Sequence, residues 1–481
     1  MKNVMTAQSS HASTTECKSQ GLLFPELTTK TVTVNFDGGP VSSDGGGVLL
    51  ARLDRSYGYL HRLAACFQDH RDPELIEHEL LAVLRQRVYG LALGYEDLND
   101  HDRLRADPLL ASLCGKADPL GQDRTRAQDR GQALAGKSTL NRLELTPADA
   151  SAAARYKKIV ADPQALEDYF INEWVRSLSR DTPEVILDLD RTDDPLYGAQ
   201  EGRFFHGYYD AYCYTPLYIF AGDWPVAAAL HTADSEHLAE VLRLVARIVE
   251  RVRQRLPRVR IVLRGDSGFC RDELMRWCEQ HAVNCVLGLA RNAVLERLLR
   301  GSLRSAKSLQ AFNDSASERV FKDLRYRAKS WGRRTRRVVG KAEWTRQGAN
   351  PRLVITNLDA PAHAAQPLYE RTYCGRGNME NRIKEQKLDL FAGRTSTESL
   401  RANQLRLWFS LLAYLLVNPL RRVGLAGTHL ARATCGTIRT RLLKLGAQVQ
   451  VTARRVWVCL SSAFPLQELF GQVARRLVAA G

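Results

Sequence analysis

Three features of common protein classes are missing from this sequence. None of its ten cysteines forms a Cys-x-x-Cys pair, which argues against a structural zinc site and fits a reduced, cytosolic protein. The N-terminus has no apolar segment of the kind that a secretory signal needs. The longest apolar run, residues 407–417, is too short to span a bilayer and predicts a buried core helix. We therefore expect a cytoplasmic protein with no membrane partner.

Acidic residues are fewer than basic ones. The chain of 481 residues has 53 Asp and Glu against 69 Lys and Arg, a formal charge of +16. Residues 322–346 contribute +8 and residues 391–481 contribute +11, which leaves −3 for the rest of the chain. Clustered positive charge predicts a surface that follows the phosphates of a nucleic acid. A solvated face and a membrane-surface patch are the alternatives.

The pattern of apolar residues divides the chain into a helical first part and an α/β second part. Residues 31–56 predict short strands with glycine turns, and residues 74–158 predict mainly helices. From about residue 183, consecutive strands are followed by alternating strands and helices, which indicates a mixed sheet flanked by helices. The predicted strands are 185–190, 204–220, 226–231, 260–266, 284–290 and 352–358, and the predicted helices are 235–256, 271–282, 365–374, 378–391 and 399–417.

Residues 131–138 match the phosphate-binding pattern G-x-x-x-x-G-K-[ST]. A working site of this kind needs a buried strand before the glycines and a helix after them. Residues 116–130 are too polar to form such a strand, whereas residues 138–145 fit a helix. We interpret the segment as a polar turn before a helix and do not expect an ATP site.

Carboxylates occur in two predicted strands that are otherwise apolar. Asp188 and Asp190 share one face of the strand VILDLD, where they are costly unless they are paired, solvated or bound to metal. Asp266 comes where the strand RIVLRGD ends, and sites of α/β sheets assemble at such strand ends. A strand with one wet face and an Asx turn at a strand exit are the alternatives.

A third motif is more specific. Tyr373, Arg376, Glu380 and Lys387 form the pattern Y-x2-R-x3-E-x6-K. On a helix, Glu380, Lys384 and Lys387 share a face, and Arg376 joins them if the helix continues through Gly377. The alternative is the charged face of a surface helix.

The three motifs together predict a chemistry. Two-metal phosphoryl transfer needs carboxylates that converge from different elements, and Asp190, Asp266 and Glu380 meet that need. Mg²⁺ prefers oxygen ligands, so no His or Cys is required. Two Mg²⁺ ions are therefore expected, and Mn²⁺ is the alternative metal. Basic residues beside Glu380, Lys384 among them, would bind DNA phosphates near the scissile bond.

These segments resemble a known family. DLDRTDD, LRGDSGF and the Tyr373–Lys387 pattern resemble the DDE transposases of bacterial insertion sequences. VNFDGGPVSSDGGG, EGRFFHGYYDAYCY and NRIKEQKLDLF are typical of the insertion-sequence family numbered thirteen-eighty. The resemblance implies an RNase H-like α/β core with catalytic, metal-binding carboxylates: Asp190 on the first strand, Asp266 after the fourth and Glu380 on a late helix. It also implies that Tyr373, Arg376 and Lys387 contact phosphates at the element's end.

The resemblance also implies an insertion between Asp266 and Glu380, which would contain the first basic segment. We expect Arg333, Arg334, Arg336 and Arg337 to bind DNA there. Trp331 and Trp344 would either stack on a flipped base or pack in a core. The expected division is a disordered tail (1–20), a β-turn and helical DNA-binding region (21–165), the first part of the core (166–292), an inserted basic, β-rich subdomain (293–350), the second part of the core with the catalytic helix (351–420) and a basic C-terminal region (421–481).

By this resemblance the protein is a cut-and-paste transposase on the bacterial nucleoid. It would bind terminal inverted repeats of double-stranded DNA as a homodimer, cleave the element ends and join the 3′-OH to target DNA. An RNase H-like nuclease without strand transfer and an inactive DNA-binding regulator are the alternatives. Arg191, Gly375 and Asn378 depart from the family pattern and would weaken activity.

Overall fold

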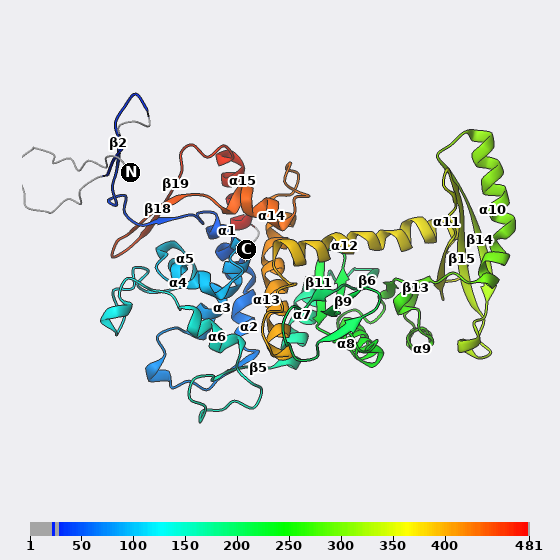
Figure 1. Cartoon of the computed structure of the whole chain (residues 1–481), viewed down its shortest axis with the longest axis horizontal. Helices are drawn as coiled ribbons and strands as arrows, with labels where there is room; N and C mark the ends of the chain where they lie inside the picture. Colours follow the sequence, from blue (N-terminus) through cyan, green and yellow to red (C-terminus); the bar gives the residue numbers. More distant parts are fainter. Residues whose placement is uncertain (1–21, 25–27, 480–481) are drawn as a thin grey trace, which may run out of the picture.

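The structure is a computed structural model that describes residues 22–24 and 28–479. The predicted tail 1–20 lies outside the described residues. The molecule is elongated (Figure 1): the N-terminal helices lie at one end, a central sheet lies in the middle, and α10 (Ala293–Asn313) covers two long strands at the other end.

A mixed sheet forms the centre of the molecule, as the sequence predicts. Its strands β6 and β12 are parallel, as are β12 and β13, and the other neighbours are antiparallel. The order is β11 (Trp224–Ala229), β10 (Leu217–Ala221), β6 (Glu184–Arg191), β12 (Arg260–Gly265), β13 (Asn284–Leu289), β17 (Arg352–Thr356), β15 (Arg336–Thr345) and β14 (Ser317–Tyr326), with β16 (Gly348–Ala349) paired to β15.

The basic segment predicted as an inserted subdomain continues this sheet. Strands β14 and β15 form an antiparallel hairpin, and β15 also pairs with β17, which pairs with β13. Helix α10 packs on the hairpin through the buried Leu295 and Leu299. A Cβ atom at Gly340 of β15 would lie 2.5 Å from Leu299, so a side chain there would push the helix away.

Helices cover both faces of the sheet. On one face, α7 (Pro163–Ser177), α8 (Leu238–Arg255) and α9 (Asp272–Gln280) bury the alternate residues Ile261 and Leu263 of β12. On the other face, Val262 packs in a smaller cluster with Leu368 and Tyr369 of a long helical segment. The period of two along β12 therefore divides its side chains between two cores.

That long segment is continuous from residue 365 to residue 389 (Figure 1). It consists of α11 (Ala365–Pro367), η6 (Leu368–Tyr373), η7 (Cys374–Arg376), α12 (Gly377–Lys384) and η8 (Glu385–Asp389). The two helices that the sequence predicts here are therefore one, and the turn passes through Gly377 with a right-handed φ of −56°.

The N-terminal half is mainly helical, with two departures from the prediction. Residues 47–57 form helix α1 (Gly47–Tyr57) instead of a strand, because Leu49, Leu50 and Leu53 are buried on one helical face. Residues 145–158 are not helical. The other helices here are α2 (Tyr59–Ala64), η1 (Pro73–Leu75), α3 (Leu80–Leu93), η2 (Leu98–Asp100), α4 (His101–Leu104), α5 (Pro108–Cys114), η3 (Ala127–Asp129) and α6 (Lys137–Glu144).

Helix α13 (Leu400–Pro419) joins the two halves. It contains the longest apolar run, and almost all of its second half is buried against the N-terminal helices and the sheet, which confirms the predicted core helix. No helix among the described residues is long and apolar enough to cross a membrane. The short elements near it are β4 (Phe67–Asp69), β5 (Ile159–Ala161), η9 (Leu420–Gly424), α14 (Cys435–Ile438) and η10 (Arg439–Leu443).

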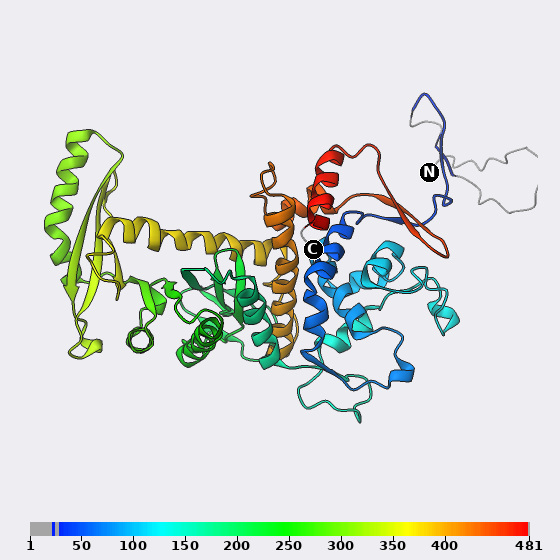
Figure 2. The ribbon, with the colours of Figure 1, turned by 180° about the vertical axis from the view of Figure 1, so that it is seen from behind.

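The two ends of the described chain pack together. Strand β18 (Ala447–Val451) pairs with β19 (Val456–Leu460) and with β3 (Val41–Ser42). Helix α15 (Gln467–Ala479) lies beside α1 (Figure 2). The basic C-terminal region therefore completes the N-terminal part of the fold. Strands β1 (Leu22–Phe24) and β2 (Val32–Val34) form a separate pair.

A buried ion pair connects the sheet to the long helical segment. Arg264 of β12 lies opposite Asp188 of β6 and makes two hydrogen bonds of 2.6 Å to its carboxylate. Its third nitrogen, Nη1, donates to the carbonyl of Thr372 at 2.6 Å. Burial raises the pKa of Asp188, and Arg264 opposes that shift. A Cβ atom at Gly375 would lie 2.7 Å from Nη1, so this departure from the family pattern makes room for Arg264.

We predict that breaking this pair destabilises the fold strongly. Arg264→Met leaves the Asp188 carboxylate buried without its partner, which costs about 3–5 kcal/mol; Asp188→Leu does the same to the guanidinium. The double variant should lose less than the sum of the two single losses. The measurement is the free energy of unfolding in denaturant.

The same two strands provide the control. Arg260 and Glu184 also pair between β12 and β6, but the Arg260 side chain is half exposed. Arg260→Met should therefore cost about 1 kcal/mol or less. Equal losses for Arg260→Met and Arg264→Met would contradict the prediction.

Candidate active site

The predicted carboxylates meet at one edge of the sheet. Asp190 lies near the end of β6, and Asp266 directly follows β12. Because these strands are parallel neighbours, their carboxyl ends lie side by side. Burial raises the pKa of Asp190 to about 6, and the charges of Asp266 and Glu380 act in the same direction. Glu380 of α12 faces the same edge, because Arg376 contacts both Asp190 and Glu380.

Arg376 lies between two of these carboxylates. Its Nη1 is 3.0 Å from Oδ2 of Asp190, and its Nη2 is 3.0 Å from Oε1 of Glu380. The second contact joins residues four apart, as a continuous helix allows. Arg376 was predicted to contact phosphate; in the structure it neutralises the carboxylates. Within residues 22–24 and 28–479, no group of three or more His, Cys, Asp or Glu side chains is arranged to hold a metal ion.

Asp266 and Tyr373 occupy a tight corner beside this edge. Oδ1 of Asp266 accepts a hydrogen bond of 2.9 Å from the backbone of Gly268, so the residue does form the Asx turn that was the alternative reading. A Cβ atom at Gly288 of β13 would lie 2.8 Å from the Tyr373 hydroxyl. Glycine at that position therefore lets Tyr373 pack over the sheet edge, next to Asp266. Burial raises the pKa of Tyr373.

The other signature residues lie further along the helix. Lys384 is exposed. Nζ of Lys387 donates to Thr192 Oγ1 and Asp193 Oδ1, both at 3.2 Å. Lys387 therefore fastens the end of the helical segment to the loop that follows Asp190.

Arg191 has partners of its own. Its guanidinium lies 5.5 Å from the centre of the Phe269 ring and donates to the carbonyl of Glu236. The Arg191 side chain therefore does not pair with Asp190, and the fold accommodates this departure from the family pattern.

The four predicted DNA-binding arginines divide into two pairs. Arg333 and Arg334 are exposed in the turn between β14 and β15. Arg336 and Arg337 are each only 6% exposed. Arg336 binds Glu279 at 2.6 Å and Asp272 at 2.7 Å, and Arg337 binds Asp323 at 2.6 Å. The charges of Arg336 and Arg337 are therefore neutralised inside the protein, an arrangement that does not favour the DNA contacts predicted for them.

The structure does not bring this turn to the carboxylates. Arg337 of β15 pairs with Thr356 of β17. Thr356 in turn pairs with Val286, which lies in the first half of β13. The turn therefore lies toward the starting end of β13, whereas Asp266 follows the far end of β12. Trp331, at the start of the turn, is buried and packs under Arg336, and Trp344 is partly buried beside Lys307.

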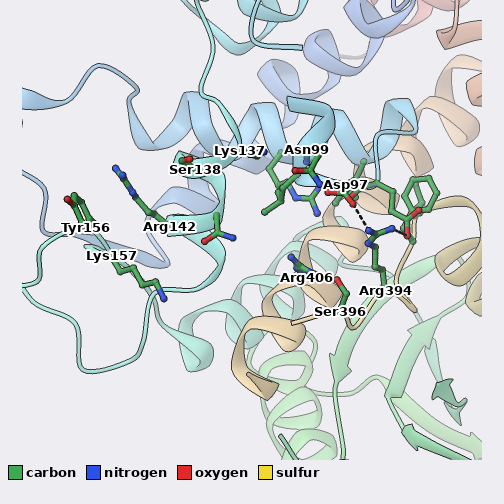
Figure 3. A pocket seen from close by; sticks show the side chains of 17 residues that line it. Asp97, Asn99, Lys137, Ser138, Arg142, Tyr156, Lys157, Arg394, Ser396 and Arg406 are labelled. Atoms are coloured by element: carbon green, nitrogen blue, oxygen red, sulfur yellow. Dashed lines mark hydrogen bonds and ion pairs between the residues drawn. The ribbon is translucent and has the colours of Figure 1, made fainter. Parts of the chain in front are cut away.

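A pocket of about 600 Å³ lies between α3, α6 and the chain after the long helical segment. Figure 3 shows Arg142, Tyr156 and Lys157 on one side of it, and Arg394 and Arg406 on another. Lys137 and Ser138 of the phosphate-binding pattern line it, but no strand precedes them. That pattern is thus a turn before α6, and none of the three carboxylates lines the pocket.

Sequence reasoning missed two residues near the site. Arg264 is the ion-pair partner that the buried Asp188 required. The spacing in the sequence could have indicated this pair, because Asp188 lies two residues before Asp190 and Arg264 lies two residues before Asp266. Burial, together with the charges of Asp193, Asp190 and Asp266, raises the pKa of Tyr209 to about 12. Its signal was the run of aromatic residues around it.

The chain is similar to known transposases. Residues 24–481 match the family described as Transposase DDE domain group 1. The piggyBac transposase, solved by cryo-EM as a synaptic complex with hairpin DNA, is similar over 82% of this chain and 79% of that chain, with 10% identity and a TM-score of 0.42. No curated protein matches the sequence. Since the family match spans nearly the whole chain, the protein belongs to the DDE transposases of group 1.

Proposed function

We propose that this protein is a cut-and-paste DNA transposase of the insertion-sequence family numbered thirteen-eighty, built on an RNase H-like core. The observation that carries the proposal is the convergence of Asp190, Asp266 and Glu380 at one edge of the sheet. The strand order supports the core: in chain order, Asp190 lies on its first strand, β6, and Asp266 follows its fourth, β12.

The residues at this edge suit divalent cations in their chemistry. Three carboxylates supply the oxygen ligands that Mg²⁺ and Mn²⁺ prefer. The pKa of Asp190 is raised mainly by burial, and the charges of Asp266 and Glu380 add to that shift. Asp190, Asp266 and Glu380 would hold two ions. When bound, such ions would supply the activation of a water or 3′-OH and the charge stabilisation of the leaving oxygen.

Arg376 must then change partners. Its guanidinium now holds Asp190 and Glu380, so both carboxylates become available only when it turns away. A DNA phosphate at the edge offers it a replacement anion of matching geometry. The exposed Lys384 is placed on the same helix to bind the neighbouring phosphate.

DNA would extend beyond this edge. The exposed Arg333 and Arg334 are the candidates for contacts far from the cleaved bond, and Arg142 and Lys157 of the pocket are candidates in the N-terminal region. Two copies of the chain would hold the two inverted repeats, on the nucleoid of a bacterial cell. A nuclease would cleave such ends without joining them, and a regulator would bind without cleaving, so the products of one reaction distinguish all three.

We predict that Asp190→Asn, Asp266→Asn and Glu380→Gln each reduce cleavage at least about 1000-fold while duplex binding remains. The assay is nicking and joining of DNA that carries the sequences flanking the gene, in Mg²⁺. Glu370→Gln is the control, because Glu370 lies on the same helical segment but pairs with the exposed Arg319. Cleavage by Asp190→Asn at the wild-type rate would refute the assignment.

A second prediction concerns Arg376. Arg376→Gln removes the cation that competes for Asp190 and Glu380, so Mn²⁺ should bind the DNA-free protein at least about tenfold more tightly. Duplex affinity should fall in the same variant. The measurement is free Mn²⁺ by electron paramagnetic resonance. Arg371→Gln, an exposed arginine on the same segment, should change neither; tighter Mn²⁺ binding there would indicate a general charge effect.

The divided arginines give a third prediction. Arg333→Gln and Arg334→Gln should each weaken duplex binding and lower the slope of log affinity against log salt by about 0.9. Arg337→Gln should instead lower the midpoint of thermal unfolding, because the carbonyls of Leu358, Asp359 and His363 lose the buried guanidinium that donates to them. An unchanged salt slope in the Arg333→Gln, Arg334→Gln double variant would remove this turn from the DNA-binding surface.

A further inference from the structure

The central sheet ends in a long strand whose outer edge is open. Strand β14 pairs with β15 and with no other strand among the described residues. It lies with α10 at the end of the molecule opposite the N-terminal helices (Figure 1). An edge strand of ten residues presents a row of backbone N–H and C=O groups with which another strand can pair.

Two cations of β14 are turned away from this edge. Edge strands usually avoid pairing by extending charged side chains, lysine above all, beyond the sheet. Lys322 instead donates through Nζ to the carbonyl of Leu298 in α10, at 3.1 Å. Arg319 lies 2.9 Å from Glu343 and 3.4 Å from Glu370. Both side chains are therefore held over the faces of the sheet, where they do not block a strand that approaches in its plane.

An apolar side of α10 lies above the same edge. Four exposed apolar residues share this side at 3.6 residues per turn: Val294 (44%), Leu298 (37%), Leu309 (42%) and Phe312 (87%). The contact of Lys322 with Leu298 places it over β14. We call β14 together with these four residues the open edge. Apolar side chains grouped on a surface in this way indicate an interaction site.

The cations of α10 lie on its other side. Lys307 reaches over β15, with Nζ 5.0 Å from the centre of the Trp344 ring. Arg300 and Arg304 are exposed and share that side of the helix. A partner at the open edge therefore meets a strand and apolar side chains and not this positive charge. Such a surface suits another protein strand better than DNA or an anionic membrane, which both bind through cations.

The open edge is complementary to a second copy of itself. In a two-fold antiparallel pair with both α10 helices on one face, residues opposite each other must point to the same face. Leu324 points into the core under α10, and Phe321 packs against Tyr369 on the other face. Pairing centred on Phe321 meets this condition. It puts Arg319 opposite Asp323 of the second copy, twice, and no like charges opposite each other.

The two helices would add apolar contact to this ladder. Helix α10 runs antiparallel to β14, because Asn292 at its start binds Tyr326 at 3.1 Å and Asn313 at its end binds Glu318 at 2.8 Å. Two copies of α10 would therefore also run antiparallel, side by side. The four apolar residues of one helix would face those of the other, so one symmetric contact buries both the strand edge and the apolar side.

We propose that the protein self-associates through the open edge, as a two-fold dimer in which β14 continues the sheet into a second copy and the apolar sides of α10 pack together. The proposed function calls for two copies at the two inverted repeats and does not say which surface joins them. The dimer does not depend on that function, because every group in the contact belongs to the DNA-free protein.

The test compares two neighbouring substitutions in the full chain without DNA. Phe312→Glu places a charge on the apolar side of α10. Ala311→Glu places the same charge one residue earlier, at an exposed position seven residues after Arg304 and so on the basic side. Phe312→Glu should weaken the dimer at least about tenfold, whereas Ala311→Glu should leave the dissociation constant unchanged. The measurement is sedimentation equilibrium over a range of protein concentrations.

Hydrogen exchange shows whether the strand takes part. In the wild type and in Ala311→Glu, the amides of residues 317–326 should exchange more slowly above the dissociation constant than below it. Phe312→Glu should need at least about tenfold more protein for the same protection. Peptides from β11, at the opposite end of the sheet order, should exchange at a rate that does not depend on concentration.

Several results would overturn the inference. A wild type that stays monomeric up to about 0.1 mM has no such contact. A dimer that survives Phe312→Glu, or that leaves residues 317–326 unprotected, uses another surface. A monomer that needs Phe312 to bind phosphatidylglycerol vesicles or duplex DNA has a different occupant at the open edge. None of these measurements involves cleavage, so each of these failures leaves the proposed function to its own assays.

Discussion

The buried contact of Arg264 with Asp188 and Thr372 determines where the proposed catalytic groups lie. Asp188 is two residues before Asp190 and Arg264 is two residues before Asp266, so a period of two puts each pair on one face of its strand. The Thr372 carbonyl that Arg264 binds lies one turn before Arg376 and two turns before Glu380. One guanidinium thus aligns all three elements that carry the carboxylates. Removing either charge would leave the other buried and unpaired, so the two residues are tolerated in this core only as a pair.

Arg376 makes the carboxylate edge stable in the absence of metal. Burial raises the pKa of Asp190, and repulsion by the charges of Asp266 and Glu380 adds to that shift. A helical arginine in contact with two of these carboxylates offsets that repulsion. In the proposed function this geometry would link cation binding to DNA binding, because a cation and Arg376 would compete for the same oxygens. We infer that phosphate, metal and Arg376 rearrange together when the site is loaded.

The sequence predicted most strands of the core in their order, and its motifs selected Asp190, Asp266 and Glu380 as the candidate carboxylates. Periodicity is local information, and these features are local. It was wrong for residues 204–220, predicted as one strand, which form β8 (Phe204–His206), β9 (Ala211–Tyr214) and β10, and it did not predict helices α7 and α10. It failed for residues 47–57, where a run of leucines fits both a strand and a helix and only the neighbouring helices decide. It also could not show that Arg336 is paired with Asp272 and Glu279 of α9, far earlier in the chain, or that Arg337 is paired with Asp323 of β14. Pairing across the fold is not visible in a linear pattern.

The same limit applies to net charge. The C-terminal segment has a charge of +11 in sequence, yet several of its cations are neutralised by acidic groups from other parts of the fold: Arg394 by Glu96 and Asp97, Arg406 by Glu144, Arg421 by Glu385 and Lys444 by Asp44. This basic segment therefore holds the N-terminal half to the core. The overall excess of +16 remains, but the part of it that would meet DNA under the proposed function depends on which cations stay exposed, such as Arg333 and Arg334. A surface built from those few residues has a lower salt dependence than the segment charges imply.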